Sequence, residues 1–149
     1  MKPSAVAACI ALMAFAAGCA GRPGPPEIVG GTPCATCGMG VSDRHFACER
    51  MAGGTWRVYD SIECLLKDGG PSAGDSIYLA DYDTQALHAA DSLWIVRGNF
   101  STPMGGGLAA FLARSAAHTV AAETGGRVGR LAEFAADTAA GGPAPEGAP

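Results

Sequence analysis

Four sulfur-bearing residues stand in glycine-rich stretches of the chain, where their side chains could bind a soft metal ion. Cys34 and Cys37 form a Cys-x-x-Cys pair, Met39 follows two residues later, and Met104 lies far downstream, before three glycines. Thiolates and thioethers are soft donors that suit Cu(I) better than any hard cation. Glycine beside a methionine exposes the thioether and lets the backbone come close to an ion. We therefore predict a Cu(I) site formed by Cys34, Cys37, Met39 and Met104.

Other uses of a Cys-x-x-Cys pair fit this sequence less well. Attachment of a c-type haem would need a histidine where Gly38 stands. A thioredoxin-like motif follows a buried strand, whereas a Gly/Pro-rich segment precedes this pair. A structural zinc site would need two further ligands, for which Cys48, Cys64 and His45 remain open. The sequence also leaves open whether Cys48 and Cys64 are free, paired in a disulfide or metal ligands.

The first residues resemble the export signal of a bacterial lipoprotein. Lys2 precedes a mostly apolar run over residues 5–17, which is too short to span a bilayer comfortably. We expect a signal peptide at residues 1–18, cleavage before Cys19 and lipid on the sulfur of Cys19. An ordinary secretory signal is the alternative. The protein is then expected on the periplasmic face of a bacterial membrane, and Ala20 favours the outer membrane.

Composition predicts one small folded domain between two unstructured segments. Residues 19–31 are rich in glycine and proline, which predicts a tether. Residues 135–149 contain mainly alanine, glycine and proline, which predicts a disordered tail. Residues 32–134 remain as the metal-binding domain. The chain has a formal net charge of −4 and no basic patch, so we expect no binding to nucleic acid.

The distribution of apolar residues predicts an α+β fold made of two related β-β-α units. Strand-like runs stand at residues 45–51, 55–59, 77–82 and 93–97. In the first unit, Asp60 and Glu63 form a capping-box pattern, which predicts a short helix ending at Gly69. In the second unit, apolar spacing from Leu108 onward predicts one face of a helix that ends near Gly125.

Several of these motifs together, in this order, resemble the NosL family. They are Cys34-Ala-Thr-Cys37-Gly-Met39, Tyr59-Asp-Ser-Ile-Glu-Cys64, Ala80-Asp-Tyr82 and Thr102-Pro-Met-Gly-Gly-Gly107. The resemblance implies a copper-binding accessory lipoprotein that passes Cu(I) to nitrous oxide reductase or to its membrane assembly machinery. It also implies a NosL/MerB-like fold of two related units. Ser61 departs from the pattern, because relatives often carry a second acidic residue there.

Two other classes of function remain open from the sequence. A thiol-dependent enzyme, either a redox enzyme or a MerB-like lyase, would use the cysteine pair but gives the methionines no role, because thioethers do no acid–base chemistry. We therefore expect a protein that is not an enzyme. A structural lipoprotein stabilised by disulfides is the third class, since an even set of cysteines in an oxidising compartment favours disulfides. His45, His88 and His118 are interpreted as structural residues.

Overall fold

The computed structural model describes residues 24–99 and 101–141 of the chain. Its elements, in chain order, are β1 (Cys48–Ala52), β2 (Thr55–Tyr59), α1 (Ile62–Lys67), β3 (Ser76–Ala80), β4 (Leu87–Ala89), the 3-10 helix η1 (Ala90–Ser92), β5 (Trp94–Arg97), β6 (Leu108–Phe111), α2 (Arg114–Thr124), β7 (Arg127–Gly129) and α3 (Leu131–Ala139). The predicted α+β class is confirmed. The expected signal peptide, the lipidated Cys19 and residues 142–149 of the expected tail lie outside the described residues.

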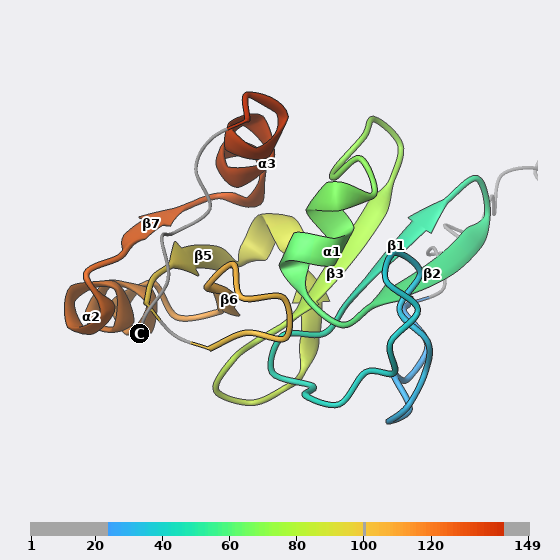
Figure 1. Cartoon of the computed structure of the whole chain (residues 1–149), viewed down its shortest axis with the longest axis horizontal. Helices are drawn as coiled ribbons and strands as arrows, with labels where there is room; N and C mark the ends of the chain where they lie inside the picture. Colours follow the sequence, from blue (N-terminus) through green and yellow to red (C-terminus); the bar gives the residue numbers. More distant parts are fainter. Residues whose placement is uncertain (1–23, 100, 142–149) are drawn as a thin grey trace, which may run out of the picture.

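The strands form two antiparallel sheets that are built on the same plan (Figure 1). The strand order is β2-β1-β3-β4 in the first sheet and β6-β5-β7 in the second. In the first sheet, β1 pairs with β2, which follows it, and on its other side with β3, which follows helix α1. In the second sheet, β5 pairs in the same way with β6 and with β7, which follows helix α2. The two related units are therefore present, and each also contains a closing strand after its helix.

Two parts of the second unit differ from the prediction. Residues 76–80 form β3, which pairs with β1 and belongs to the first sheet. Leu108–Phe111 forms strand β6 instead of the start of a helix, and all four residues are buried. A short run that is apolar throughout has no periodicity, so it cannot distinguish a strand from a helix. Helix α2 begins only at Arg114, and it ends at Gly125, whose left-handed φ of 64° makes it the C-cap.

The start of α1 also differs from the prediction by one residue. Ser61, and not Asp60, is the N-cap, because its side chain accepts a hydrogen bond from the Cys64 N–H. The side chain of Asp60 therefore does not cap the helix and can interact with other side chains. Strand β1 begins at Cys48, later than the predicted start at residue 45.

The folded domain extends past both of its predicted ends. Ile28, inside the predicted tether, is buried and packs with Val41 and Ala47. At the other end, α3 continues to Ala139, although the domain was predicted to end at Phe134. Phe134 is fully buried and fixes the helix to the core, and the alanines that follow it have the highest helix propensity.

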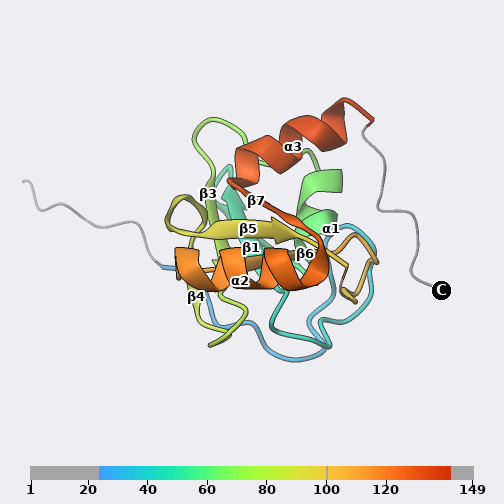
Figure 2. The same cartoon turned by 90° about the vertical axis from the view of Figure 1, so that its left-hand side faces the viewer.

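One apolar cluster joins the two units. It contains Cys34, Cys48, Tyr59, Ile62, Cys64, Leu65, Leu66 and Leu79 from the first unit, and Leu93, Ile95, Leu108, Ala110, Leu131 and Phe134 from the second. A separate cluster lies between the second sheet and α2, which runs along β5 (Figure 2). Among the described residues, no helix has the length and apolar character needed to cross a membrane.

Asp81 connects the two sheets directly. One of its carboxylate oxygens accepts a hydrogen bond from the Leu112 N–H at 2.8 Å, and the Tyr82 N–H donates to the Ala110 carbonyl at 2.7 Å. The other carboxylate oxygen accepts hydrogen bonds from the backbone and the side chain of Thr84. Asp81 therefore shapes the turn after β3, and these contacts fix β6 relative to the first unit.

Candidate metal centre

Three thiols and one carboxylate meet near the start of α1. Cys34, Cys37, Asp60 and Cys64 each present one ligand atom, and all of these atoms lie within 4.8 Å of one another. A tetrahedral ion with metal–sulfur bonds of about 2.3 Å separates its ligands by roughly 4 Å. The four side chains are therefore close enough to share one metal ion after small movements.

A tight turn brings Cys34 and Cys37 to this point. The Cys34 N–H donates to the Met39 carbonyl at 2.7 Å, and the Gly38 N–H donates to the Cys34 carbonyl at 2.9 Å. Gly38 has a φ of 77°, a left-handed conformation that glycine adopts without a steric cost. The glycine after the Cys-x-x-Cys pair therefore closes the turn that places both sulfurs on one side.

Two contacts attach this turn to the rest of the site. The Ala35 N–H donates to the Val58 carbonyl of β2 at 2.8 Å, and the Thr36 hydroxyl donates to the Cys64 carbonyl of α1 at 2.8 Å. Asp60 comes directly after β2, and Cys64 lies in the first turn of α1. The β2–α1 connection and the Cys-x-x-Cys turn are thus held face to face.

The site is buried on one side and reachable on the other. Cys34, Asp60 and Cys64 are at most 3% exposed, whereas Cys37 is partly exposed. The Cys37 thiol donates to a carboxylate oxygen of Asp60 at 3.6 Å, and the other oxygen of Asp60 has no hydrogen-bond partner among the described residues. An unpartnered buried carboxylate oxygen is costly, so it favours a bound cation or a further proton donor at this position.

Burial also controls the protonation of the thiols. It raises the pKa of the Cys37 thiol above its usual range. It raises the pKa of the Cys64 thiol too, and the neighbouring Asp60 carboxylate adds to that increase. Both thiols are therefore protonated at neutral pH, and a metal ion that binds them must displace protons.

The structure brings together two of the four residues predicted from the sequence. Cys34 and Cys37 lie in the cluster, as expected. Met104 is half-buried and packs against the apolar cluster that contains Cys34 and Cys64. Met39 follows the cysteine turn, and its side chain is 50% exposed. The ligand roles of the two methionines stay predictions.

Asp60 and Cys64 belong to the cluster although they were not in the predicted ligand set. The capping-box pattern assigns Asp60 to a helix cap, and the sequence leaves the role of Cys64 open. The available signal was their position in the Tyr59–Cys64 motif, which is one of those that resemble the NosL family. Cys48 lies outside the cluster, and its thiol donates to the Ser61 carbonyl at 3.3 Å. All four cysteines of the described residues are free thiols.

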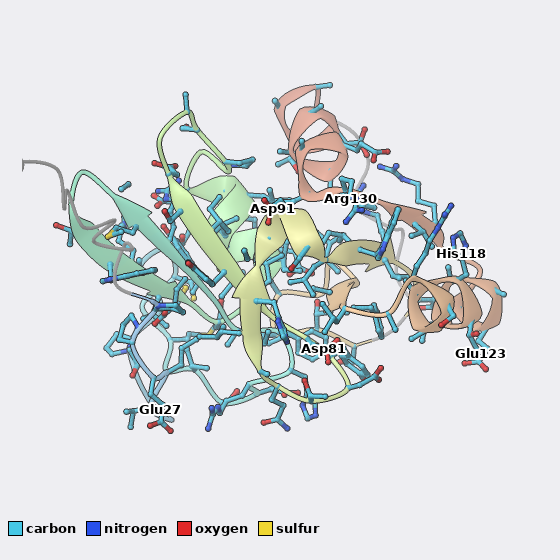
Figure 3. All side chains as sticks on the ribbon, turned by 180° about the vertical axis from the view of Figure 1, so that it is seen from behind. Glu27, Asp81, Asp91, His118, Glu123 and Arg130 are labelled. Carbon is cyan, nitrogen blue, oxygen red and sulfur yellow. The ribbon has the colours of Figure 1, made fainter. Side chains whose placement is uncertain are left out.

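The histidines have roles outside the thiol cluster. His45 contacts Asp43 at 2.6 Å through one ring nitrogen and Gln85 at 2.9 Å through the other. His88 lies in β4 opposite Leu79. His118 is exposed on α2, at the end of the molecule formed by the second unit (Figure 3). No histidine of the described residues is part of the thiol cluster.

No model of a known protein family matches the sequence, and a search of curated proteins finds no similar sequence. A solved structure matches the fold. The crystal structure of the copper chaperone NosL from Shewanella denitrificans superposes with a TM-score of 0.62, covering 74% of this chain and 94% of that chain at 18% sequence identity. The fold is NosL-like. The fold implied by the sequence motifs is thereby confirmed.

Proposed function

We propose that this protein is a Cu(I)-binding metallochaperone that works outside the cytoplasm and is not an enzyme. The observation that carries the proposal is the group of three free thiols, from Cys34, Cys37 and Cys64, within 4.8 Å of one another. Soft sulfur ligands select Cu(I) over hard cations. The NosL-like fold supports the same conclusion, because the solved structure that it matches is a copper chaperone.

A chaperone must also release its cargo, and the exposure of the site suits that requirement. Cys34 and Cys64 are buried, whereas Cys37 is partly exposed and Met39 is half-exposed. An acceptor protein could therefore reach the ion from the side of Cys37 and Met39. In this proposal Met39 and Met104 supply neutral thioethers, which need no deprotonation and do not form disulfides.

The acceptor and the location of the protein are proposed from the sequence motifs. The acceptor is nitrous oxide reductase or its membrane assembly machinery. Lipid on Cys19 holds the protein on the periplasmic face of a bacterial membrane, and residues between Cys19 and Ile28 form the tether. This segment is shorter than the predicted tether, because Ile28 packs onto the domain.

A structural zinc site is the second candidate, and Asp60 is the observation that favours it. Three cysteines and one carboxylate could fill a closed tetrahedral shell around Zn(II). Cu(I) has little affinity for a carboxylate, so in a copper site Asp60 remains a hydrogen-bond acceptor. The two candidates thus differ in whether Asp60 binds the ion.

An anaerobic titration against a Cu(I) chelator tests the proposal. We expect the reduced protein to bind one Cu(I) per chain and to lose tight binding when Cys34 and Cys37 are both changed to Ser. Cys48→Ala is the matched control, because this buried thiol lies outside the cluster and should leave the Cu(I) affinity unchanged. Stronger retention of Zn(II) than of Cu(I) would contradict the proposal and favour the zinc site.

Transfer is measured separately, by mixing the Cu(I)-loaded protein with apo nitrous oxide reductase and following copper in each protein after separation. We expect copper to move to the reductase faster than it dissociates into a competing chelator. Tight Cu(I) binding without such transfer would remove nitrous oxide reductase as the direct acceptor.

A further inference from the structure

A buried carboxylate joins α1 to the loop of the second unit that carries Met104. Glu63 is 8% exposed, and one of its carboxylate oxygens accepts hydrogen bonds from the Thr102 hydroxyl at 2.8 Å and from the Leu108 N–H at 3.2 Å. The Thr102 hydroxyl in turn accepts a hydrogen bond from the Gly107 N–H at 3.2 Å. Glu63 is therefore hydrogen-bonded to both ends of the segment from Thr102 to Leu108, which we call the Met104 loop.

The Met104 loop also lies directly against the Glu63 side chain. A Cβ atom added to Gly106 would come within 2.4 Å of Glu63 Cγ and within 2.7 Å of its Oε1. At Gly107 an added Cβ would lie 2.1 Å from the Gly98 carbonyl oxygen, and the φ of this residue is 65°. Gly106 thus allows an approach between the loop and the helix that a larger residue would prevent, and Gly107 allows the end of the loop to lie against the Gly98 backbone.

Helix α1 also carries one thiol of the cluster formed by Cys34, Cys37, Asp60 and Cys64. Glu63 directly precedes Cys64 in α1, and Met104 packs against the apolar cluster that includes Cys64 and Cys34. Cys64 belongs to the first unit and Met104 to the second. The hydrogen bonds of Glu63 therefore set where the loop of the second unit lies relative to the thiols of the first.

We propose that Glu63 is a positioning residue that holds Met104 beside the thiol cluster, so that both units contribute to one copper site. The proposal rests on the proposed function. Glu63 itself does not bind the ion. Its role is to fix the loop before copper arrives, because a ligand that is already in place loses less conformational freedom when the ion binds.

Thr102→Val tests the proposal from the loop side of the contact. This variant keeps the shape of the side chain, removes the hydroxyl between Glu63 and Gly107, and leaves α1 unchanged. We expect Met104→Leu to lower the Cu(I) affinity roughly tenfold in the wild-type protein and far less in the Thr102→Val protein. Met39→Leu is the matched control, and its effect should be the same in both backgrounds because Met39 lies on a different loop.

Amide hydrogen exchange of the copper-free protein provides a second measurement. We expect the Gly107 and Leu108 amides to exchange roughly tenfold faster or more in Thr102→Val, because both amides belong to the Glu63 contact. Gly106→Ala should have the same effect by steric contact with Glu63 and serves if Thr102→Val does not fold. Unchanged exchange in both variants would show that Glu63 does not hold the loop.

The affinity results separate this proposal from the proposed function. If wild-type protein binds Cu(I) and the effects of Thr102→Val and Met104→Leu simply add, Glu63 does not act through Met104 and the positioning role is wrong. If wild-type protein binds no Cu(I), the proposed function is wrong and the role in copper binding fails with it. Faster exchange at Gly107 and Leu108 would in that case identify the contact as a purely structural one.

Discussion

The replacement Glu49→Gln should remove a large part of the pH dependence of stability. Glu49 is the second residue of β1 and lies opposite Val58 and Tyr78 on the neighbouring strands. Its neighbours Cys48 and Arg50 contact α1 and the turn after it, so the alternation of the strand directs Glu49 to the opposite face of the sheet. The side chain is fully buried, and neither carboxylate oxygen has a hydrogen-bond partner among the described residues.

Burial raises the pKa of Glu49 from its ordinary 4.5 to about 7. The folded protein therefore holds the proton of this carboxyl more tightly than the unfolded chain does. The stabilisation from this proton is fully present below pH 4.5 and is lost as the pH rises through about 7. The difference between the two pKa values corresponds to a loss of about 3 kcal/mol in the free energy of unfolding.

Urea denaturation at a series of pH values tests this prediction. Other titrating groups cancel when the stability of wild type is subtracted from that of Glu49→Gln, and this difference should rise by about 3 kcal/mol between pH 4.5 and pH 8. Glu123→Gln, on the exposed surface of α2, is the control and should give a difference that stays flat (Figure 3). A flat difference for Glu49→Gln as well would refute the reasoning from burial.

Four further predictions concern the metal site and the anchor. Asp60→Asn should lower the Cu(I) affinity less than Cys64→Ser does, because Cu(I) prefers sulfur to oxygen, and equal losses in a chelator titration would contradict a sulfur-only site. The apparent Cu(I) affinity should fall as the pH falls from 8 to 6, because burial raises the pKa of Cys37 and Cys64 and copper must displace their protons. The expected decrease is about tenfold per pH unit for each proton displaced. An affinity that is independent of pH in the same titration would argue against thiol ligands. Met104→Leu should weaken Cu(I) binding and change the free energy of unfolding by less than about 1.5 kcal/mol, and unchanged binding would show that Met104 is a packing residue. Mass spectrometry of the mature N-terminus should find lipid on Cys19, and an unmodified cysteine or a start before it would reject the anchor.

Local patterns in the sequence predicted the parts of the fold that depend on neighbouring residues. The strands of the β1–β2 hairpin were predicted from the runs at residues 45–51 and 55–59, and Gly53 and Gly54 between them have the positive φ that a tight turn requires. The end of α2 at Gly125 was predicted for a similar reason. The strand Leu108–Phe111 was missed because its burial depends on packing between the two units, which a local pattern does not contain.

The candidate site was predictable only in part, because it is assembled over a long distance in the chain. Cys34 and Cys37 were recognised because a short turn is enough to bring their sulfurs together. Asp60 was assigned to the helix cap, since the sequence does not show that the cysteine turn packs against the β2–α1 connection. The role of Glu63 was likewise hidden, because its partners lie in the second unit.

X-ray absorption spectroscopy of the Cu(I)-loaded protein tests the central claim most directly. Three thiols within 4.8 Å of one another predict a first shell around copper that contains only sulfur. The sulfur contribution should decrease in Cys64→Ser and stay constant in Cys48→Ala, because only Cys64 belongs to the cluster. A first shell made mainly of oxygen or nitrogen, or one that is the same in Cys64→Ser as in wild type, would contradict the assignment of this cluster as the copper site.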